Sequence, residues 1–434
     1  MKKKLLSPLF PVFIIVLVLS GCFSEFRGET GNLSISIGTG SSRVYVEPSE
    51  IASLEHEIIL KGPTGVISRT ITGSGTLSFE LAPGKWDVRV RAVTNDTKNL
   101  DSLYLEMFGY PKRMLRALGW TTVDVKAGKG STAKIDMLSA TEVTSWEQLE
   151  FLVLYPSAEF VAEEVIVVKG SFPTVGTSPI DISYRKITLV AESDDALIWR
   201  GPSFTTAFFD VNYNGGPGTL KLKAIDGARL ILDGQKDTSA NDSLIEVKQT
   251  SFLEMYDGVV LQNNMGISGG AINLENGSKF TMYGGTIRNN DAGGSGGAVS
   301  LDTEASFIMR GGTISGNSAI GNNGGGVHVL EGSFTMSGGT ISGNDCGGDT
   351  SSTTFGGGVF IGVNSSFSKK GGGTIYGSEA AKGLRNIAGS IIHGEGHAVY
   401  VVEITGGSGV IRSEKSLNFT AGPGMDLNSD DNAW

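Results

Sequence analysis

The chain has 434 residues, 63 of them glycine, and a formal net charge of −10 at pH 7. Nucleic acids and anionic lipids bind basic faces, so this acidic balance excludes nucleic acid as a partner. Only two cysteines, Cys22 and Cys346, are present, which excludes a disulfide-stapled scaffold.

The first 22 residues have the pattern of an export signal. Lysines at positions 2–4 precede an apolar run over 5–19, which is shorter than a membrane span. The Leu-Ser-Gly-Cys ending at 19–22 is similar to the lipobox of bacterial lipoproteins, and this resemblance implies diacylglyceryl modification of Cys22. We therefore expect residues 1–21 to be a signal peptide and Cys22 to anchor the protein in a membrane through its acyl chains.

The residues after Cys22 suggest where the anchor lies. Phe23 follows the cysteine in place of the Asp that retains many lipoproteins at the inner membrane, which favours the outer membrane of the cell envelope. Loss of residues 1–21 removes three of the 35 Lys and Arg residues and no acidic one, so the mature chain carries a net charge of −13. We interpret residues 22–31 as a lipidated tether.

Residues 32–140 alternate between apolar and polar positions in short runs separated by Gly and Pro turns, as in an antiparallel β-sandwich. The segment LAPGKWDVRVRA resembles the turn and following strand of immunoglobulin-like and carboxypeptidase-regulatory-like sandwiches. We expect an immunoglobulin-like sandwich that acts as a spacer. Trp86 is then either a core residue or a carbohydrate contact. It falls on the apolar side of the alternating pattern, which favours the core.

From residue 141 to 434 we expect a parallel β-helix. A short helix is predicted over 145–154, because Thr144 to Glu147 has capping-box spacing and Trp146, Leu149 and Val153 form an apolar stripe. This helix is expected to cap the first coil, since an open parallel coil exposes unpaired strand edges. Irregular coils follow it.

Residues 251–345 repeat every 27 residues. Within each unit the apolar residues alternate with polar ones in three short strands separated by Gly or Asn corners, a pattern that predicts coils of a right-handed, pectin-lyase-like parallel β-helix. We expect about nine to eleven coils at ~4.8 Å spacing. A ladder of side-chain amides is predicted at one corner of the repeat, formed by Asn263, Asn290, Asn317 and Asn344.

The repeat also resembles a known family. GGAI at 269–272, GGAV at 296–299 and the hydrophobic-x-x-Asn motifs that end at the ladder asparagines look like the GGA(I/L/V) and FxxN motifs of the polymorphic outer-membrane proteins. That family's β-helices are surface passengers implicated in adhesion. Val or Ile replaces the family's Phe, and we expect no membrane barrel after the last coil. The resemblance implies the coil architecture and surface interaction.

Catalytic and metal chemistry is not expected. Asp226 and Asp233 lie close together in IDGARLILDG, but Asp-Gly corners are usually turn devices. The acidic residues of the regular repeats do not recur at the repeat step, although hydrolases of this fold need carboxylates on adjacent coils. His393 and His397 flank Glu395 in a glycine loop, where a spacing of four has no metal-binding meaning. Cys346 is expected to be an incidental loop residue, and no cofactor or metal is predicted.

Two functions remain from the sequence. The first is a non-catalytic lipoprotein whose rod serves as a surface, adhesion or structural interaction module, with protein or glycan partners contacting the loops at 291–297, 318–326 and 345–357. The second is a carbohydrate-active β-helix protein, a polysaccharide lyase or hydrolase. Clustered surface Asp residues or stacked outward aromatic residues would favour the second. The outward positions hold mostly Ser, Thr, Asn and Gly, with Tyr283, Tyr376 and Tyr400 as isolated aromatic residues, which favours the first.

Overall fold

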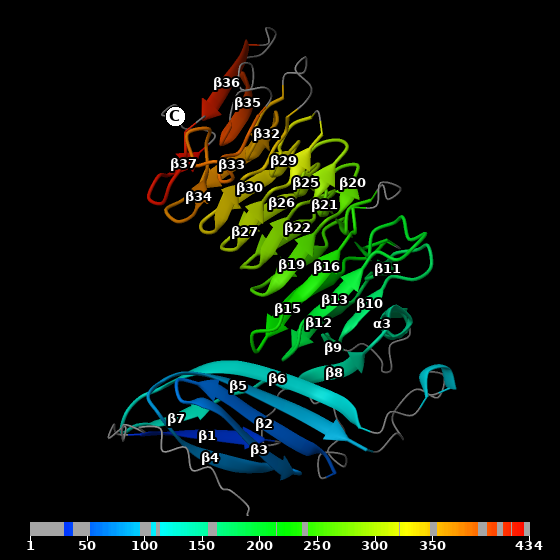
Figure 1. Cartoon of the computed structure of the whole chain (residues 1–434), viewed down its shortest axis with the longest axis vertical. Helices are drawn as coiled ribbons and strands as arrows, with labels where there is room; N and C mark the ends of the chain where they lie inside the picture. The colour runs from blue at the N-terminus through cyan, green and yellow to red at the C-terminus, as the bar shows by residue number, and fades with distance from the viewer. Residues whose placement is uncertain are drawn as a thin grey trace, which may run out of the picture.

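The regular secondary structure of the described residues is almost entirely β-strand, as expected from the sequence. The structure is a computed structural model, and it describes residues 30–37, 53–95, 106–109, 113–154, 163–213, 215–236, 242–320, 322–347, 354–388, 397–405, 411–417 and 419–428. An N-terminal unit up to residue 143 lies at one end, and a stack of coils from residue 164 onward rises from it (Figure 1). The predicted lipid site, Cys22, lies outside the described residues.

Two sheets build the N-terminal unit. The smaller one has the order β4-β1-β7, and the larger one has the order β3-β2-β5-β6-β8. Alternate side chains of both sheets meet in one apolar core, where Trp86 is fully buried and donates a hydrogen bond from Nε1 to the Ala82 carbonyl at 2.9 Å. Trp86 is therefore a core residue and does not contact a ligand. The strands are β1 (Gly31–Ile37), β2 (Glu55–Gly62), β3 (Gly65–Thr72), β4 (Gly75–Leu81), β5 (Gly84–Thr94), β6 (Met114–Val125), β7 (Gly130–Ala133) and β8 (Leu138–Val143).

The larger sheet does not stop at the N-terminal unit. Strand β8 pairs antiparallel with β6 and parallel with β9, so the sheet continues into the coil stack as one 14-stranded sheet, here called the shared sheet. Its strands in the coils are β9 (Glu164–Val168), β12 (Lys186–Glu192), β15 (Thr219–Ile225), β18 (Phe252–Met255), β22 (Lys279–Met282), β26 (Ser306–Met309), β30 (Ser333–Met336) and β33 (Ser366–Lys369).

Each coil contributes two further parallel strands. The second sheet has eight strands: β10 (Ser171–Pro173), β13 (Ala196–Trp199), β16 (Leu230–Asp233), β19 (Val259–Gln262), β23 (Thr286–Arg288), β27 (Thr313–Ser315), β31 (Thr340–Ser342) and β34 (Thr374–Ile375). The third sheet has nine: β11 (Ile180–Asp181), β14 (Phe209–Val211), β17 (Ile245–Val247), β21 (Ile272–Leu274), β25 (Val299–Leu301), β29 (Val327–Val329), β32 (Val359–Ile361), β35 (Val399–Thr405) and the antiparallel β36 (Ile411–Leu417).

Short strands β20 (Met265–Gly266), β24 (Asp291–Ala292) and β28 (Ser318–Ala319) form a small fourth sheet. These long parallel sheets are compatible with a parallel β-helix. The second sheet gives eight coils in the described part of the chain, fewer than the nine to eleven expected, because the coils near both ends carry longer connections than the regular repeat.

Identical inward side chains stack from coil to coil. Phe280, Phe307 and Phe334 lie face to face, with ring centroids 4.7 and 4.9 Å apart, and all three are buried. The methionine row is in register as well, since Met255 pairs with Met282 and each later coil repeats the match. Burial of such rows gives each coil the apolar contact that a single coil lacks.

The amide ladder runs through the buried corner between the second and fourth sheets. Asn290 donates from its backbone N and from Nδ2 to Oδ1 of Asn317, both at 3.0 Å, and Asn317 makes the same pair of bonds to Asn344 at 3.1 and 2.9 Å. Each Nδ2 also donates to a carbonyl of the preceding coil, such as that of Ile287. Every polar atom of these buried side chains is thereby satisfied, as an apolar interior requires.

The ladder begins at Asn264, so the prediction of Asn263 as its first member is wrong. Asn264 is buried and its backbone N donates to Oδ1 of Asn290 at 3.0 Å, whereas Asn263 has a positive φ of 53° and donates to Asp233 at 2.9 Å. The turn after Met255 holds one residue more than the later turns, so the ladder asparagine of this coil is shifted by one position. Because Asn263 and Asn264 are both asparagine, counting in steps of 27 does not reveal the shift.

Both ends of the ladder are also closed. Arg200 is buried and donates from Nη2 to Oδ1 of Asn264 at 2.7 Å. At the other end Asn386 accepts from both nitrogens of Asn344, at the position that the sequence pattern gives to Ser378. An insertion in this coil moves the asparagine out of the repeat and leaves the ladder intact.

The helix α3 (Trp146–Leu154) covers the first coil. Its buried face includes Trp146, which meets Phe204 edge to face with ring centroids 5.5 Å apart. The helix cap is Ser145, whose hydroxyl accepts from the backbone N of Gln148 at 3.3 Å, one residue later than the capping box proposed at Thr144.

The opposite end is closed by residues 419–428, which include β37 (Leu427–Asn428). Lys369 replaces methionine at the end of the buried methionine row and is fully buried. Its ammonium donates to the carbonyls of Gly422 at 2.8 Å and Met425 at 2.7 Å. A charged side chain in the core thus fastens the closing segment.

Candidate functional site

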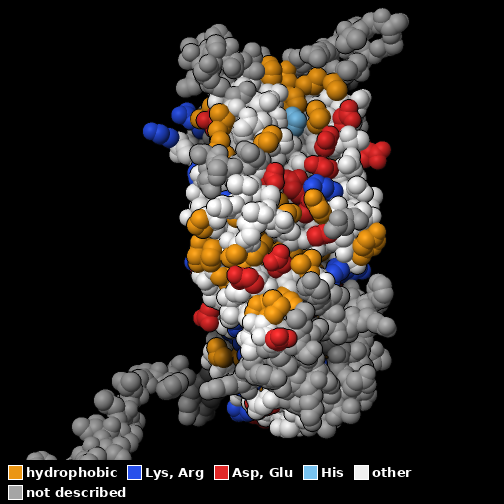
Figure 2. Space-filling model, turned by 90° about the vertical axis from the view of Figure 1, so that its right-hand side faces the viewer, with side chains coloured by type: hydrophobic (Ala, Val, Ile, Leu, Met, Phe, Trp, Pro, Cys, Tyr) orange, Lys and Arg blue, Asp and Glu red, His pale blue; other side chains and the backbone are white. Residues whose placement is uncertain are grey.

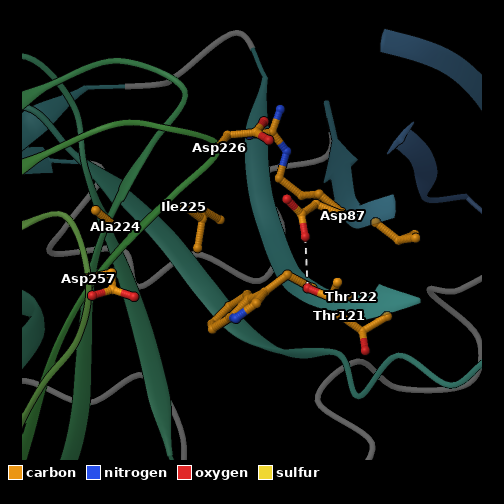
Figure 3. A pocket seen from close by; sticks show the side chains of 10 residues that line it. Asp87, Thr121, Thr122, Ala224, Ile225, Asp226 and Asp257 are labelled. Carbon is orange, nitrogen blue, oxygen red and sulfur yellow. Dashed lines mark hydrogen bonds and ion pairs between the residues drawn. The ribbon is translucent and has the colours of Figure 1, made fainter. Parts of the chain in front are cut away.

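A groove lies where the N-terminal unit meets the coil stack (Figure 3). Its volume is about 350 Å³, within the range of small-ligand sites. We call it the junction groove, and its lining residues are Asp87, Val88, Arg89, Trp120, Thr121, Thr122, Ala224, Ile225, Asp226 and Asp257.

The groove exists because the shared sheet folds back on its own outer face. Val93 and Leu118 of the N-terminal unit pack against Val165, Val167 and Val190 of the first coils in one buried cluster. Trp120 and Ile225 lie at the rim of this cluster and are only partly buried. The apolar contact therefore fixes the two parts against each other and leaves an apolar floor open at its edge.

Buried ion pairs reinforce the same contact. Arg89 of β5 lies 3.1 Å from Glu192 of β12 and 2.7 Å from Asp226 in the turn after β15. Glu192 is only 1% exposed and also pairs with Arg91 at 3.3 Å and Lys169 at 3.5 Å. Breaking one member of such a network leaves an uncompensated buried charge, so these residues hold the junction closed.

A column of cations and aromatic rings leads from the groove along the outer face of the shared sheet. Lys223 Nζ lies 5.2 Å from the ring centroid of Trp120 and 4.0 Å from that of Tyr256. Tyr256 stacks on Tyr283 with centroids 4.8 Å apart, and Arg310 lies 5.8 Å from the Tyr283 ring. Tyr283 is therefore not isolated, contrary to the sequence interpretation.

The stacking decides what this column can bind. The Tyr256 and Tyr283 rings stack on each other and have cations beside them. The Tyr256 hydroxyl already donates to Glu254 at 2.7 Å. These two rings are stacked on each other, whereas Trp120 has one cation, Lys223, beside its ring and is the aromatic residue that lines the groove. The signal for the column was visible in the sequence, because Tyr256, Tyr283 and Arg310 each follow a methionine of the repeat.

Asp226 and Asp233 are both engaged in structural contacts. Asp226 has a positive φ of 64° in its turn and pairs with Arg89. Asp233 accepts from the backbone of Gln235 at 2.8 Å and from the side chain of Gln262 at 2.7 Å. They stand at opposite ends of β16, so the turn interpretation fits both.

Carboxylates do recur on neighbouring coils in the irregular part of the stack, which precedes the regular repeats. Asp181, Asp210 and Glu246 are direct partners across the third sheet, and Asn273 follows them in the same row. Figure 2 shows acidic side chains scattered over the face of the coil stack that is turned to the viewer, among apolar and uncharged ones. The row was missed because it lies in irregular coils with no fixed period. We call these three residues the acidic row.

The acidic row has strongly altered protonation. Asp210 is 2% exposed and accepts from Lys248 Nζ at 2.6 Å, while burial raises its pKa. Glu246 accepts from Asn273 at 3.0 Å, and burial raises the pKa of its carboxyl to about 7. A carboxyl that exchanges its proton near neutral pH beside a second carboxyl can serve in acid/base chemistry.

The remaining predicted residues have structural surroundings. Cys346 is fully buried beside Ala319 and Ala388, so it is a packing residue and not an incidental loop residue. His397 Nδ1 accepts from the backbone N of Ala388 at 3.2 Å, and burial lowers the pKa of its imidazole. His393 lies outside the described residues.

Several glycines in the corner loops between the strands cannot be replaced by a residue with a side chain. A Cβ at Gly297 would collide with the Gly325 carbonyl, and one at Gly325 would come within 2.6 Å of the Gly357 carbonyl. Close approach of stacked backbones therefore requires these glycines. Two large apolar side chains are exposed in the turns that follow β20 and β28. Ile267 is 60% exposed and Ile320 is 51% exposed.

Comparison with known proteins finds no match among family models, curated proteins or solved structures. Within the described ranges, no group of three or more His, Cys, Asp or Glu side chains is arranged to hold a metal ion. No helix in the same ranges is long and apolar enough to cross a membrane.

Proposed function

We propose that this chain is a cell-envelope lipoprotein, anchored through Cys22 at the outer membrane, whose coil stack serves as a non-catalytic interaction rod. The coil stack is proposed to be a right-handed, pectin-lyase-like β-helix, since crossovers between parallel strands are right-handed in about 98% of cases. The N-terminal unit is proposed to be an immunoglobulin-like spacer between the tether and the rod.

One observation carries this proposal. The side chains that recur in every regular coil are used inside the rod, where the asparagines satisfy one another and the Phe and Met rows fill the core. The repeat is therefore a device for building length and rigidity. What varies from coil to coil lies at the turns, and variable groups on a rigid scaffold are typical of binding surfaces.

The proposed contact surface includes the exposed turns after β20 and β28. Ile267 and Ile320 are large apolar side chains exposed on that side of the rod. A protein or glycan partner that contacts this side would bury both. The resemblance to the polymorphic outer-membrane proteins supports adhesion as the role, and it depends on the repeat motifs alone.

The test is binding of the labelled full chain to extracellular matrix and to isolated cell-envelope material. The double variant Ile267→Ser and Ile320→Ser is expected to lose at least half of the bound signal. The matched control is Val66→Ser, because Val66 is 64% exposed on the N-terminal unit. Equal binding by all three proteins, or no binding by the parent chain, would contradict the proposal.

The acidic row supports a second candidate function, a carbohydrate-active enzyme. Asp210 and Glu246 are neighbours on adjacent strands of the third sheet, and glycoside hydrolases use a pair of carboxyl groups that lie close together. The deep burial of Asp210 and the amide bond to Glu246 favour the non-catalytic role. Release of sugars from a polysaccharide panel by the parent chain but not by Glu246→Gln would establish the enzyme instead.

A further inference from the structure

The junction groove offers a ligand an apolar floor and hydrogen-bond acceptors on its walls. The floor comes from Trp120, Ile225 and Ala224, all partly exposed. Asp87 and Thr122 form the wall from the N-terminal unit, and Asp257 forms the wall from the coil stack (Figure 3). Both walls are rigidly placed, because the buried cluster and the ion pairs described above fix the two parts of the molecule.

The one cation that lines the groove, Arg89, is already engaged, because it pairs with Glu192 and Asp226. Lys223, which does not line the groove, lies between the rings of Trp120 and Tyr256. A negatively charged ligand would therefore meet no free positive group among the groove's lining residues. It would also meet the carboxylates of Asp87 and Asp257.

The acceptors, by contrast, have free capacity. Asp87 is exposed, lines the groove and accepts from the Thr122 hydroxyl with Oδ1 at 2.7 Å, so its carboxylate has further acceptor capacity. Asp257 is exposed and makes no hydrogen bond or ion pair within the described residues. A matching ligand must donate several hydrogen bonds and also present an apolar surface to an indole ring.

We infer that the junction groove binds a neutral, hydroxyl-rich saccharide, whose apolar C–H face lies on Trp120 and whose hydroxyls donate to Asp87 and Asp257. A pyranose has an apolar face and a rim of hydroxyl donors, so one ring meets both requirements. Contacts of this kind, with an aromatic group and a few placed polar groups, are usual in small-ligand sites. Acidic sugars are excluded by the unpaired carboxylates.

This inference rests on the proposed function, since it assigns one ligand class to the interaction rod. The test uses isothermal titration of the full chain in detergent with three tetrasaccharides: cellotetraose, fully N-acetylated chitotetraose and tetragalacturonate. Saturable binding is expected for at least one of the two neutral probes and none for the acidic one. Asp257→Asn and Trp120→Ala are each expected to weaken binding about ten-fold, which corresponds to ~1.4 kcal/mol.

The controls separate binding from folding. Asp302→Asn changes an exposed aspartate in a turn that does not line the groove, and it should bind as the parent does. Asp257 is exposed, so its variant keeps the inference testable even if Trp120→Ala fails to fold. Absence of binding by both neutral probes, stronger binding of tetragalacturonate, or parental affinity in Asp257→Asn would overturn the inference. The proposed function fails separately, through the envelope-binding test on Ile267 and Ile320.

Discussion

Asn263 and Asn264 are adjacent residues of the same type with opposite surroundings. Asn264 is buried in the ladder, while Asn263 occupies a left-handed turn and bonds to Asp233. The repeat pattern predicts that an amide ladder exists, because asparagine recurs once per coil. It cannot predict which member of a doublet enters the ladder, since that depends on the length of the preceding turn.

The two positions give a direct mutational test. Asn264→Ala removes the acceptor of Arg200 Nη2 and the donor to the carbonyls of Asp242 and Gly270, at an expected cost of ~1–3 kcal/mol in unfolding free energy. Asn263→Gly keeps the positive φ without strain and should cost less than about 1 kcal/mol. Urea unfolding of both variants measures the difference, and an equal or larger loss at Asn263 would place that residue in the ladder.

Protonation at Glu246 predicts a pH effect on stability. Burial raises the pKa of its carboxyl to about 7, so the folded chain holds the proton more tightly than the unfolded chain does. The stabilisation that comes from this tighter proton binding is fully present below about pH 4.5, and it is lost as the pH rises through about 7. Between pH 5 and pH 8, Glu246→Gln should therefore gain about 1–2 kcal/mol relative to the parent.

The stability of the variant must be compared with that of the parent at each pH, because His328 changes the stability with pH in the opposite direction. Burial lowers the pKa of its imidazole to about 4, so this residue contributes stability above about pH 6.5 that is lost as the pH falls toward 4. Thermal unfolding of both proteins at several pH values isolates Glu246. Glu304→Gln is the exposed control, and a pH-independent difference at Glu246 would show that its carboxyl is not buried as described.

Among the elements, the two ends of the rod differ in how well they could be predicted. The apolar stripe of residues 145–154 predicts a covering helix, and α3 buries that stripe in the core. The closing segment at 419–428 has no such periodicity. Its attachment depends on Lys369, which a sequence pattern assigns to the surface because lysine is rarely buried.

Lys369 provides the test at this scale. Lys369→Met would complete the methionine row but remove the two bonds to the Gly422 and Met425 carbonyls. Hydrogen exchange over 419–428 should accelerate at least ten-fold, while exchange in β26 should stay near the parental rate. The control is Lys370→Met at an exposed position. Unchanged exchange in the closing segment would mean that other contacts hold it.

The irregular coils explain why the acidic row escaped prediction. The regular repeats keep one length per coil, so equivalent positions can be matched by counting. Asp181, Asp210 and Glu246 are 29 and 36 residues apart and become neighbours only through strand pairing. Loops of unequal length hide such neighbours, although each coil still presents one outward residue to the same row.

At the scale of the whole molecule, the shared sheet joins the N-terminal unit to the rod. The sequence predicts two separate domains, because a composition shift and a helix separate them. The pairing of β8 with both β6 and β9 instead makes one continuous sheet. The junction groove follows from this long-range pairing, and no local pattern signals it.

Membrane attachment remains a prediction of the lipobox. Cys22→Ser should lose acyl labelling when the chain is expressed in a bacterial host, because serine lacks the thiol that is modified. The variant should partition into the aqueous phase of a detergent extraction, whereas the parent enters the detergent phase. Labelling of the variant at the parental level would locate the lipid elsewhere.

The central claim is that the rod acts as an interaction module at the cell surface, and protease shaving of intact cells tests it most directly. Cells that produce the chain are treated with an impermeant protease and probed with an antibody against the coil stack, with a periplasmic protein as the control for lysis. The account predicts that the coil-stack signal falls sharply while the control protein stays intact. A coil-stack signal that survives until the envelope is permeabilised would contradict the account, because a shielded rod cannot contact partners outside the cell.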